Sequence, residues 1–396
     1  MDDPVQPPPR PGVFREIGWY LLFALATVAV LVAGLRLESA DVRAPFEYDG
    51  DALLILPLVK ATLERGSHWR NERLGAPGIQ ELHDFPVVDH LHFGIIWLIG
   101  QAVPDPFVVF NLYYLLTYPL TTLAGMFALR RLGLSVPAAG VGGLLYAFQP
   151  YHYLRGLMHY FLAAYWVIPL TLLVTLRVCQ GRLPFFRPGT DGRYRFRPAS
   201  WDSLGSVLVA AATASAGAYY AFFACAFLAC AGLYGWVTLK TWRAAASAGL
   251  VLLIVFAAGL VNHAPAFLYQ YRYGHNSAPT ARLPEEAEIY GLKLTQLALP
   301  VEKHNWPFLA QIEATYDSAM RPLQNENKSS CLGLVGTVGL VGLLAAAVLP
   351  GRRGWPVGAL AFLTLCGVLI GTIGGVGAAF NLLVTPQVRC YNRISI

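Results

Sequence analysis

The stretch AAASAGLVLLIVFAAGLVNHAP, residues 244–265, contains no Asp, Glu, Lys or Arg. A helix needs about 20 predominantly apolar residues to cross the roughly 30 Å hydrocarbon core of a bilayer. This stretch has that length, and comparable apolar runs recur along the chain. The sequence therefore predicts that lipid surrounds much of this protein.

The composition extends this prediction to the whole chain. Of 396 residues, 56% are hydrophobic and 13% are charged, about half the charged fraction of a typical soluble domain. The net charge of +6 could indicate a nucleic-acid partner, but the basic residues lie in short connectors between apolar runs, where they orient helices. We predict an all-α polytopic membrane protein with no nucleic-acid partner.

Nine apolar runs are predicted to cross the bilayer. They are residues 17–37, 106–129, 134–150, 158–178, 201–219, 220–239, 244–265, 331–349 and 357–376. With these spans, the inner side has 14 Lys and Arg and 5 Asp and Glu. The outer side has 15 Lys and Arg and 18 Asp and Glu. The excess of basic residues inside predicts a cytoplasmic N-terminus. Residues 1–16, which are rich in proline, are predicted to form a disordered tail, and residues 17–396 a single transmembrane domain.

Two segments allow more than one threading. Residues 201–239 are too long for one crossing at 1.5 Å per residue, so we predict two spans that turn near Gly217. Residues 91–103 are too short, and we predict an interfacial or re-entrant helix. Residues 38–105 and 266–330 then form long outer loops with interfacial helices, including a lid helix over residues 51–65.

An acidic cluster follows the first span. Glu47, Asp49 and Asp51 surround Gly50, whose conformational freedom lets the chain bend so that both aspartates face one point. One carboxylate there could accept a proton from an acceptor hydroxyl, while its neighbour binds a sugar or a divalent cation. A solvated acidic turn is the alternative interpretation.

The first outer loop contains further polar and aromatic candidates for substrate binding. These are Trp69, Asn71, His83 and Asp84. His90 and His92 would present both imidazoles to a metal only in an extended strand, and the apolar run that follows favours the start of a helix. We therefore assign no metal ligand, and leave open whether a divalent cation takes part. In the alternative interpretation Asp84 or Asp89 caps that helix.

Cations on the outer face could bind a phosphate. Arg155 with His159, and Arg389 with Arg393, each have the i, i+4 spacing that places two side chains on one helical face. Guanidinium groups bind phosphate oxygens in bidentate fashion, although basic side chains also extend to the membrane interface without a ligand. His304 lies among carboxylates and aromatic rings of the late outer loop, a composition suited to carbohydrate or to an interfacial aromatic belt.

Short motifs link the first outer loop to a known family. The sequences EYDGD at 47–51, GSHWRN at 66–71 and GAP at 75–77 resemble the corresponding loop of the YfhO family of bacterial membrane proteins. The likeness covers about residues 40–180. That family looks like the larger C-fold (GT-C) group of membrane glycosyltransferases.

The resemblance implies an inverting glycosyltransferase in the bacterial inner membrane. Such an enzyme takes a sugar from a polyprenyl-phosphate carrier and transfers it to a cell-envelope polymer, lipid or protein on the extracytoplasmic side. The base expected for this group corresponds to Asp49 or Asp51. Members of such groups continue beyond this length, and residues 392–396 look like the start of another helix, so we expect a fragment truncated at its C-terminus.

Two other functions are compatible with a polytopic chain. A transporter or lipid-carrier flippase usually has ionisable groups near the bilayer midplane, whereas the predicted spans have almost none through their middles. A non-catalytic membrane scaffold of the same architecture is the third option, since a fold does not fix a function.

Overall fold

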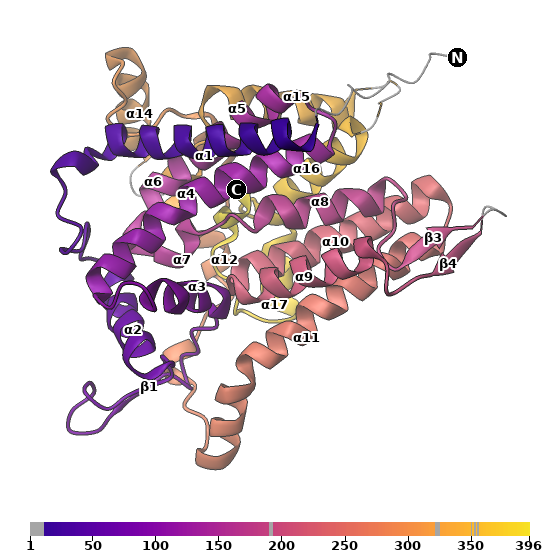
Figure 1. The fold of residues 1–396 in the computed structure, drawn as a ribbon. Helices are drawn as coiled ribbons and strands as arrows, with labels where there is room; N and C mark the ends of the chain where they lie inside the picture. Colours follow the sequence, from indigo (N-terminus) through magenta and orange to yellow (C-terminus); the bar gives the residue numbers. More distant parts are fainter. Residues whose placement is uncertain (1–11, 190–192, 321–324, 350, 352–353, 355) are drawn as a thin grey trace.

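The computed structural model of this protein describes residues 12–189, 193–320, 325–349, 351, 354 and 356–396. It is mostly helical, with two small antiparallel β-ribbons (Figure 1). The helices are α1 (Val13–Leu35), α2 (Ala52–Arg65), α3 (His90–Gly100), α4 (Pro106–Arg131), α5 (Val136–Ala147), α6 (Pro150–Arg155), α7 (Tyr160–Ala163), α8 (Ile168–Cys179), α9 (Trp201–Ser215), α10 (Ala218–Leu239), α11 (Trp242–Tyr273), α12 (Glu286–Ile289), α13 (Leu294–Ala298), α14 (Pro307–Met320), α15 (Gly333–Val348), α16 (Val357–Gly371) and α17 (Val376–Leu383). The 3-10 turns are η1 (Leu37–Ser39), η2 (Leu157–His159), η3 (Ala278–Thr280), η5 (Glu326–Ser330) and η6 (Tyr391–Ser395), and the ribbons pair β1 (Arg70–Asn71) with β2 (Gln80–Glu81) and β3 (Phe186–Pro188) with β4 (Tyr194–Phe196).

Five helical segments of the described chain are long and apolar enough to cross a membrane. They are Phe14–Leu35, Pro106–Arg131, Leu157–Cys179, Ala218–Leu239 and Trp242–Tyr273. The other four predicted spans coincide with shorter helices, α5, α9, α15 and α16, which have 12 to 16 residues. The helical class is confirmed, and a total of nine crossings stays a prediction.

The boundaries of several elements differ from those expected. Helix α1 begins at Val13, so the predicted tail 1–16 is too long by four residues, and its first eleven residues lie outside the described part. Helix α11 continues to Tyr273, past the expected loop start at residue 266. Its 32 residues extend about 48 Å, longer than the hydrocarbon core, so its end continues beyond the bilayer.

The predicted break near Gly217 is confirmed. Helix α9 ends just before this glycine and α10 begins just after it, and its φ of 139° is unfavourable for residues with a side chain.

Buried polar contacts of α3 hold the turn between α9 and α10 in place. His92, which is fully buried, contacts the Ala216 carbonyl through Nε2 at 2.9 Å and the Tyr113 hydroxyl through Nδ1 at 2.5 Å.

Helices do occupy the long loops that were predicted to hold them. Helices α2 and α3 lie in the first loop, and α12, α13 and α14 lie in the last. The apolar face of α2 packs against α3 and α4 around fully buried side chains such as Leu58, Ile96 and Phe110. In Figure 1, α2, α3 and β1 lie at one end of the molecule, and β3 and β4 lie at the other.

Candidate functional site

The acidic loop after α1 contacts the turn after α6. The Asp51 amide donates to the Met158 carbonyl at 2.9 Å, and the Met158 amide donates to Glu47 Oε2 at 3.2 Å. Gly50 has a φ of 55°, and a Cβ atom there would lie 2.9 Å from the Met158 oxygen. The glycine therefore allows the close approach that brings this loop onto the bundle.

Asp51 and Asp49 differ in their surroundings. Asp51 starts α2 through its backbone carbonyl, and its carboxylate makes no capping hydrogen bond. Burial raises the pKa of Asp51, while the positive charges of Arg393 and Arg155 oppose that rise. Asp51 is nevertheless an exposed residue, so an acceptor can reach it. Asp49 is exposed too, but its Oδ1 accepts the Gly50 amide at 2.7 Å.

A second carboxyl group lies near Asp51. Burial of Asp89 raises its pKa to about 7, with a further contribution from the charge of Asp51. A Cβ atom at Gly217 would lie 3.4 Å from Asp89 Oδ1, so the turn between α9 and α10 lies against this group. Asp89 precedes α3, but its side chain caps no helix, so the capping role considered for it is wrong.

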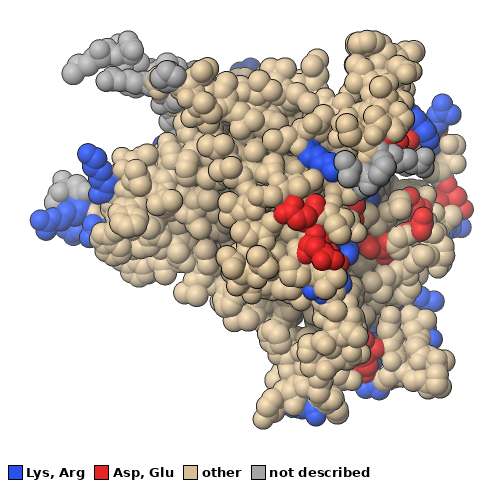
Figure 2. Space-filling model, turned by 180° about the vertical axis from the view of Figure 1, so that it is seen from behind, with Lys and Arg blue, Asp and Glu red and all other residues tan. Residues whose placement is uncertain are grey.

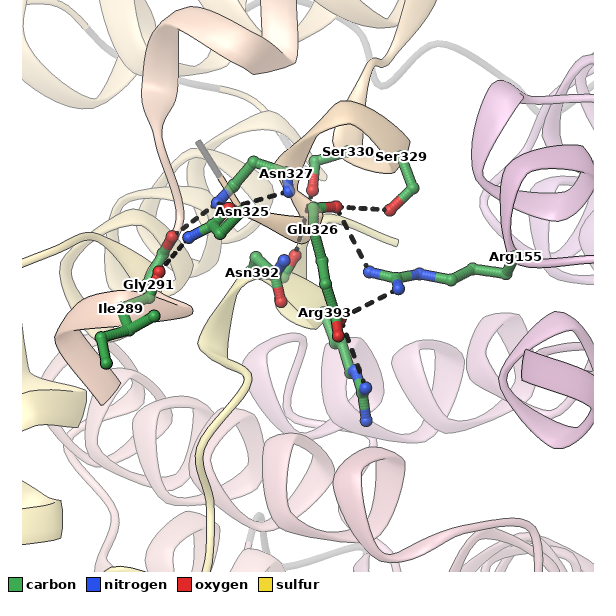
Figure 3. Close-up of polar contacts among 10 residues, drawn as sticks. All are labelled: Arg155, Ile289, Gly291, Asn325, Glu326, Asn327, Ser329, Ser330, Asn392 and Arg393. Carbon is green, nitrogen blue, oxygen red and sulfur yellow. Dashed lines mark hydrogen bonds and ion pairs between the residues drawn. The ribbon is translucent and has the colours of Figure 1, made fainter. Parts of the chain in front are cut away.

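Two buried arginines bind one carboxylate in the centre of the site. Glu326 Oε2 lies 2.9 Å from Arg155 Nη1 and 3.4 Å from Arg393 Nη2 (Figure 3). The side chains of Arg155 and Arg393 are 3% and 7% exposed. Burial would raise the pKa of Glu326, but the two guanidinium charges outweigh burial and lower it. Arg155, Arg393 and Glu326 together carry two positive charges and one negative charge.

The turn that presents Glu326 is fixed by asparagine and serine side chains. Asn327, fully buried, donates to the Gly291 carbonyl at 2.8 Å and accepts the Lys293 amide at 3.0 Å. Ser329 donates to the backbone carbonyl of Glu326 at 2.9 Å. In the view of Figure 3, Gly291 and Asn327 lie on the side of Glu326 away from Arg155, whereas Ser329 lies on the same side as Arg155. These hydrogen bonds fix the turn that carries the Glu326 carboxylate.

Each arginine of the site also lies over a tyrosine ring. The distances from guanidinium carbon to ring centroid are 5.2 Å for Arg155 over Tyr151, 4.2 Å for Arg393 over Tyr219 and 5.5 Å for Arg389 over Tyr290. Such stacking orients a guanidinium group without neutralising it. The Nε atoms of Arg155 and Arg393 are buried and have no hydrogen-bond partner.

The two predicted cation pairs converge, although not in the way expected. Helix α6 ends at Arg155, Gly156 follows with a φ of 45°, and His159 ends the 3-10 turn η2. Arg389 precedes the short turn η6, which contains Arg393. Neither pair shares a helical face, so that part of the prediction is wrong. Tertiary packing still brings all four close enough for their charges to interact.

The remaining predicted residues lie outside this cluster. Trp69 stacks on His83 at 5.4 Å between centroids, and His83 stacks on Tyr269 of α11 at 4.2 Å. Asp84 is half-buried. Asn71 and His304 form hydrogen bonds with residues close in sequence. Asn71 Oδ1 accepts the Arg73 amide at 3.0 Å, and His304 Nδ1 accepts the Trp306 amide at 3.0 Å. No hydrogen bond or ion pair of the described residues joins any of these five to Arg155 or Arg393.

Sequence reasoning missed two members of the site. Glu326 was not selected because nothing in its local sequence distinguishes it from the other glutamates of residues 266–330. Asp89 was considered only as a helix cap. Both are identified by contacts between segments far apart in the chain, 171 residues in the case of Arg155 and Glu326.

An apolar cavity of about 270 Å³ adjoins the cluster. Side chains of α8, α10 and α16 line most of it, and Arg393 and Ser395 contribute its polar edge. A ligand with a charged head and an apolar chain matches this combination. Among the residues that the structure describes, no group of three or more His, Cys, Asp or Glu is placed to hold a metal ion.

Acidic side chains gather at one end of the molecule and basic ones dominate the other in the view of Figure 2. At the candidate site, the carboxyl group of Asp51 is under the influence of the positive charges of Arg155, Arg389 and Arg393. This combination suits proton transfer next to an anionic ligand.

Comparison with known families identifies the central part of the chain. The family described as a domain of unknown function, DUF6311, matches residues 93–373. The match includes Arg155, His159 and Glu326, whereas Asp51 and Arg393 lie outside it. No curated protein matches this chain.

Proposed function

This chain belongs to the DUF6311 family, and we propose that it is a membrane glycosyltransferase that moves a sugar from a polyprenyl-phosphate donor to a cell-envelope acceptor. The observation that carries the proposal is the position of Asp51. Its amide donates to the carbonyl of Met158, three residues after Arg155, and the positive charges of Arg393, Arg155 and Arg389 oppose the rise in the pKa of its carboxyl group. A base and a phosphate-binding cluster are the two parts that such a transfer needs.

The proposed reaction is a single displacement with inversion. Asp51 accepts the proton of an acceptor hydroxyl while that oxygen attacks the anomeric carbon. The bond from the anomeric carbon to the phosphate oxygen breaks, and its electron pair leaves with the polyprenyl phosphate. Arg155 and Arg393 stabilise the negative charge that develops on the leaving phosphate. A divalent cation could add to this positive charge, and the transfer assay below can test the requirement by chelation.

The apolar cavity beside Arg393 offers a place for the carrier. Its lining by α8, α10 and α16 suits the first isoprenoid units, because apolar surface gains free energy when it leaves water. The phosphate would then lie at the polar edge, next to the cluster. Trp69 and His83, which stack face to face, provide an aromatic surface on which an acceptor sugar could bind.

The test is transfer of label from a polyprenyl-phosphate sugar by the purified full chain in liposomes. We expect label to move to an envelope acceptor with release of one polyprenyl phosphate for each sugar. The nucleotide-activated form of the same sugar is the matched control and should not react. Movement of the intact donor across the bilayer would instead establish a flippase, and neither movement nor transfer would favour a scaffold.

We also propose an inner-membrane location with a cytoplasmic N-terminus. A tag inserted at Gly189, beside the basic β3–β4 ribbon, should be shielded from a membrane-impermeant reagent in intact cells. A tag at Ala319, in α14, should be labelled under the same conditions. Labelling after permeabilisation controls for access to each tag. The opposite pattern would place the proposed site on the cytoplasmic face and remove the extracytoplasmic reaction.

A further inference from the structure

The β3–β4 ribbon carries a basic cleft at the end of the molecule away from the candidate site. The cleft has a volume of about 740 Å³, and Arg187, Arg195 and Arg197 line it together with Pro198 and Ser200. Figure 2 shows basic side chains at this end. Residues 177–202 contain six arginines and two aspartates, an excess of four positive charges.

The strand register places like charges together. Arg187 pairs directly with Arg195, and Phe186 pairs with Phe196. Directly paired residues project from the same face of a ribbon, so one face carries guanidinium groups and the other carries phenyl rings. Like charges directly opposite each other destabilise a ribbon. Asp202 lies 3.0 Å from Arg187 and offsets part of the charge of this pair.

Phe186 and Tyr194 attach the ribbon to the helices. Phe186 packs against the apolar clusters beneath it, and the Tyr194 hydroxyl donates to the Gly181 carbonyl at 3.0 Å. Phe196 is 58% exposed and lines the cleft together with the arginines. Arg195 and Arg197 are both exposed at the cleft.

An apolar stripe begins where the cleft ends. Helix α9 starts at Trp201, directly after Ser200, and its exposed side chains include Trp201, Leu204 and Leu208 at 87%, 45% and 71%. Steps of three and four residues put these side chains on one helical face. A tryptophan between charged and apolar surface is typical of the boundary between lipid headgroups and acyl chains.

We propose that this cleft binds the headgroup of an anionic phospholipid, whose acyl chains follow the α9 stripe. Guanidinium groups hold the phosphate oxygens, and Leu204 and Leu208 contact the chains. A free phosphate would use the cleft alone, and the continuity of cleft and stripe favours the lipid. The proposal does not depend on the function of the outer site.

The test is retention of phosphatidylglycerol by the purified full chain, measured by native mass spectrometry over a range of lipid concentrations. Replacing both Arg195 and Arg197 by Gln should weaken retention on the order of 30-fold, from the attraction expected for two basic residues near an anionic surface. Phosphatidylcholine retention should not change. The double variant Lys240→Gln with Arg243→Gln removes equal charge from a neighbouring helix junction and should have little effect.

Further variants separate charge from folding and lipid from free phosphate. Replacing Arg195 and Arg197 by Lys keeps the charge and should retain most of the affinity. Glycerol phosphate, which has no acyl chains, should not displace the lipid at equal concentration. Displacement by glycerol phosphate would overturn the lipid assignment, and equal losses in the Gln variant and the Lys240–Arg243 control would show that the cleft is not a binding site.

Discussion

Asp51→Asn is expected to reduce the rate of sugar transfer by about 10²- to 10⁴-fold, the usual contribution of a positioned general base. Asparagine keeps the shape of the side chain but cannot accept the proton of the acceptor hydroxyl. The measurement is label transfer at saturating donor. Asp49→Asn is the matched control, because Asp49 belongs to the same loop but bonds to the Gly50 amide, and it should keep most of the activity. Undiminished transfer by the Asp51 variant would remove the proposed base.

The same variant has a defined effect on stability and on the pH profile. The pKa of Asp51 is raised in the fold by burial, so its contribution to stability exists at low pH and is lost as pH rises through the folded-state pKa. At neutral pH the Asn variant should therefore be at least as stable as the parent. Transfer by the parent should rise with pH through that raised pKa and then level off. Arg393→Gln should move this rise to higher pH, because it removes the charge that opposes the shift.

Glu326→Gln is expected to destabilise the protein by roughly 3 kcal/mol, since removing one member of a buried ion pair leaves the other uncompensated. Here two guanidinium groups, Arg155 and Arg393, lose their shared carboxylate. Thermal unfolding of the purified protein in detergent measures the change. Glu302→Gln is the control: Glu302 also pairs with a cation, Lys328 at 3.4 Å, but is 52% exposed, and its loss should cost less than about 1 kcal/mol.

The dependence of stability on pH and on phosphate distinguishes loss of the Glu326 ion pairs from general disruption of the turn that carries Glu326. The pKa of Glu326 is lowered in the fold, so the parent should lose the stability of this contact as pH falls through that lowered pKa, and the Gln variant should show no such loss. Inorganic phosphate should stabilise the Gln variant more than the parent, because an anion can take the place of the carboxylate. Equal phosphate effects on both proteins would mean that the cluster does not accept anions.

Local sequence was sufficient to predict the elements of this protein but often not their ends. Long apolar runs predicted helices at every expected span, because backbone hydrogen bonds in lipid must be satisfied within the segment. Gly217 marked a break, since a φ of 139° suits glycine. The end of α11 was missed because residues 266–273 are stabilised by contacts with the segment between α1 and α4. One of these is the 2.8 Å hydrogen bond from Gln270 to His83.

The site was predicted only in fragments. Asp51, Arg155 and Arg393 were selected separately for their chemistry, and the i, i+4 spacing offered for two pairs was irrelevant, because Gly156 ends α6 and η6 is a short turn. Nothing in the sequence could relate Arg155 to Glu326, since the free energy that brings them together comes from packing of helices between them. Desolvation of Asp51 has the same origin.

The sequence alone determined that this chain is helical, that several of its helices are long and apolar enough to cross a membrane, and that most of its carboxylates and histidines gather in the long loops. Those properties follow from the transfer free energy of each side chain, which depends on composition and order. Only the tertiary structure decided that Arg155 and Arg393 share Glu326 and that their charges act on Asp51, because electrostatic interaction depends on distances in space and is largely screened beyond about 10 Å of salt water.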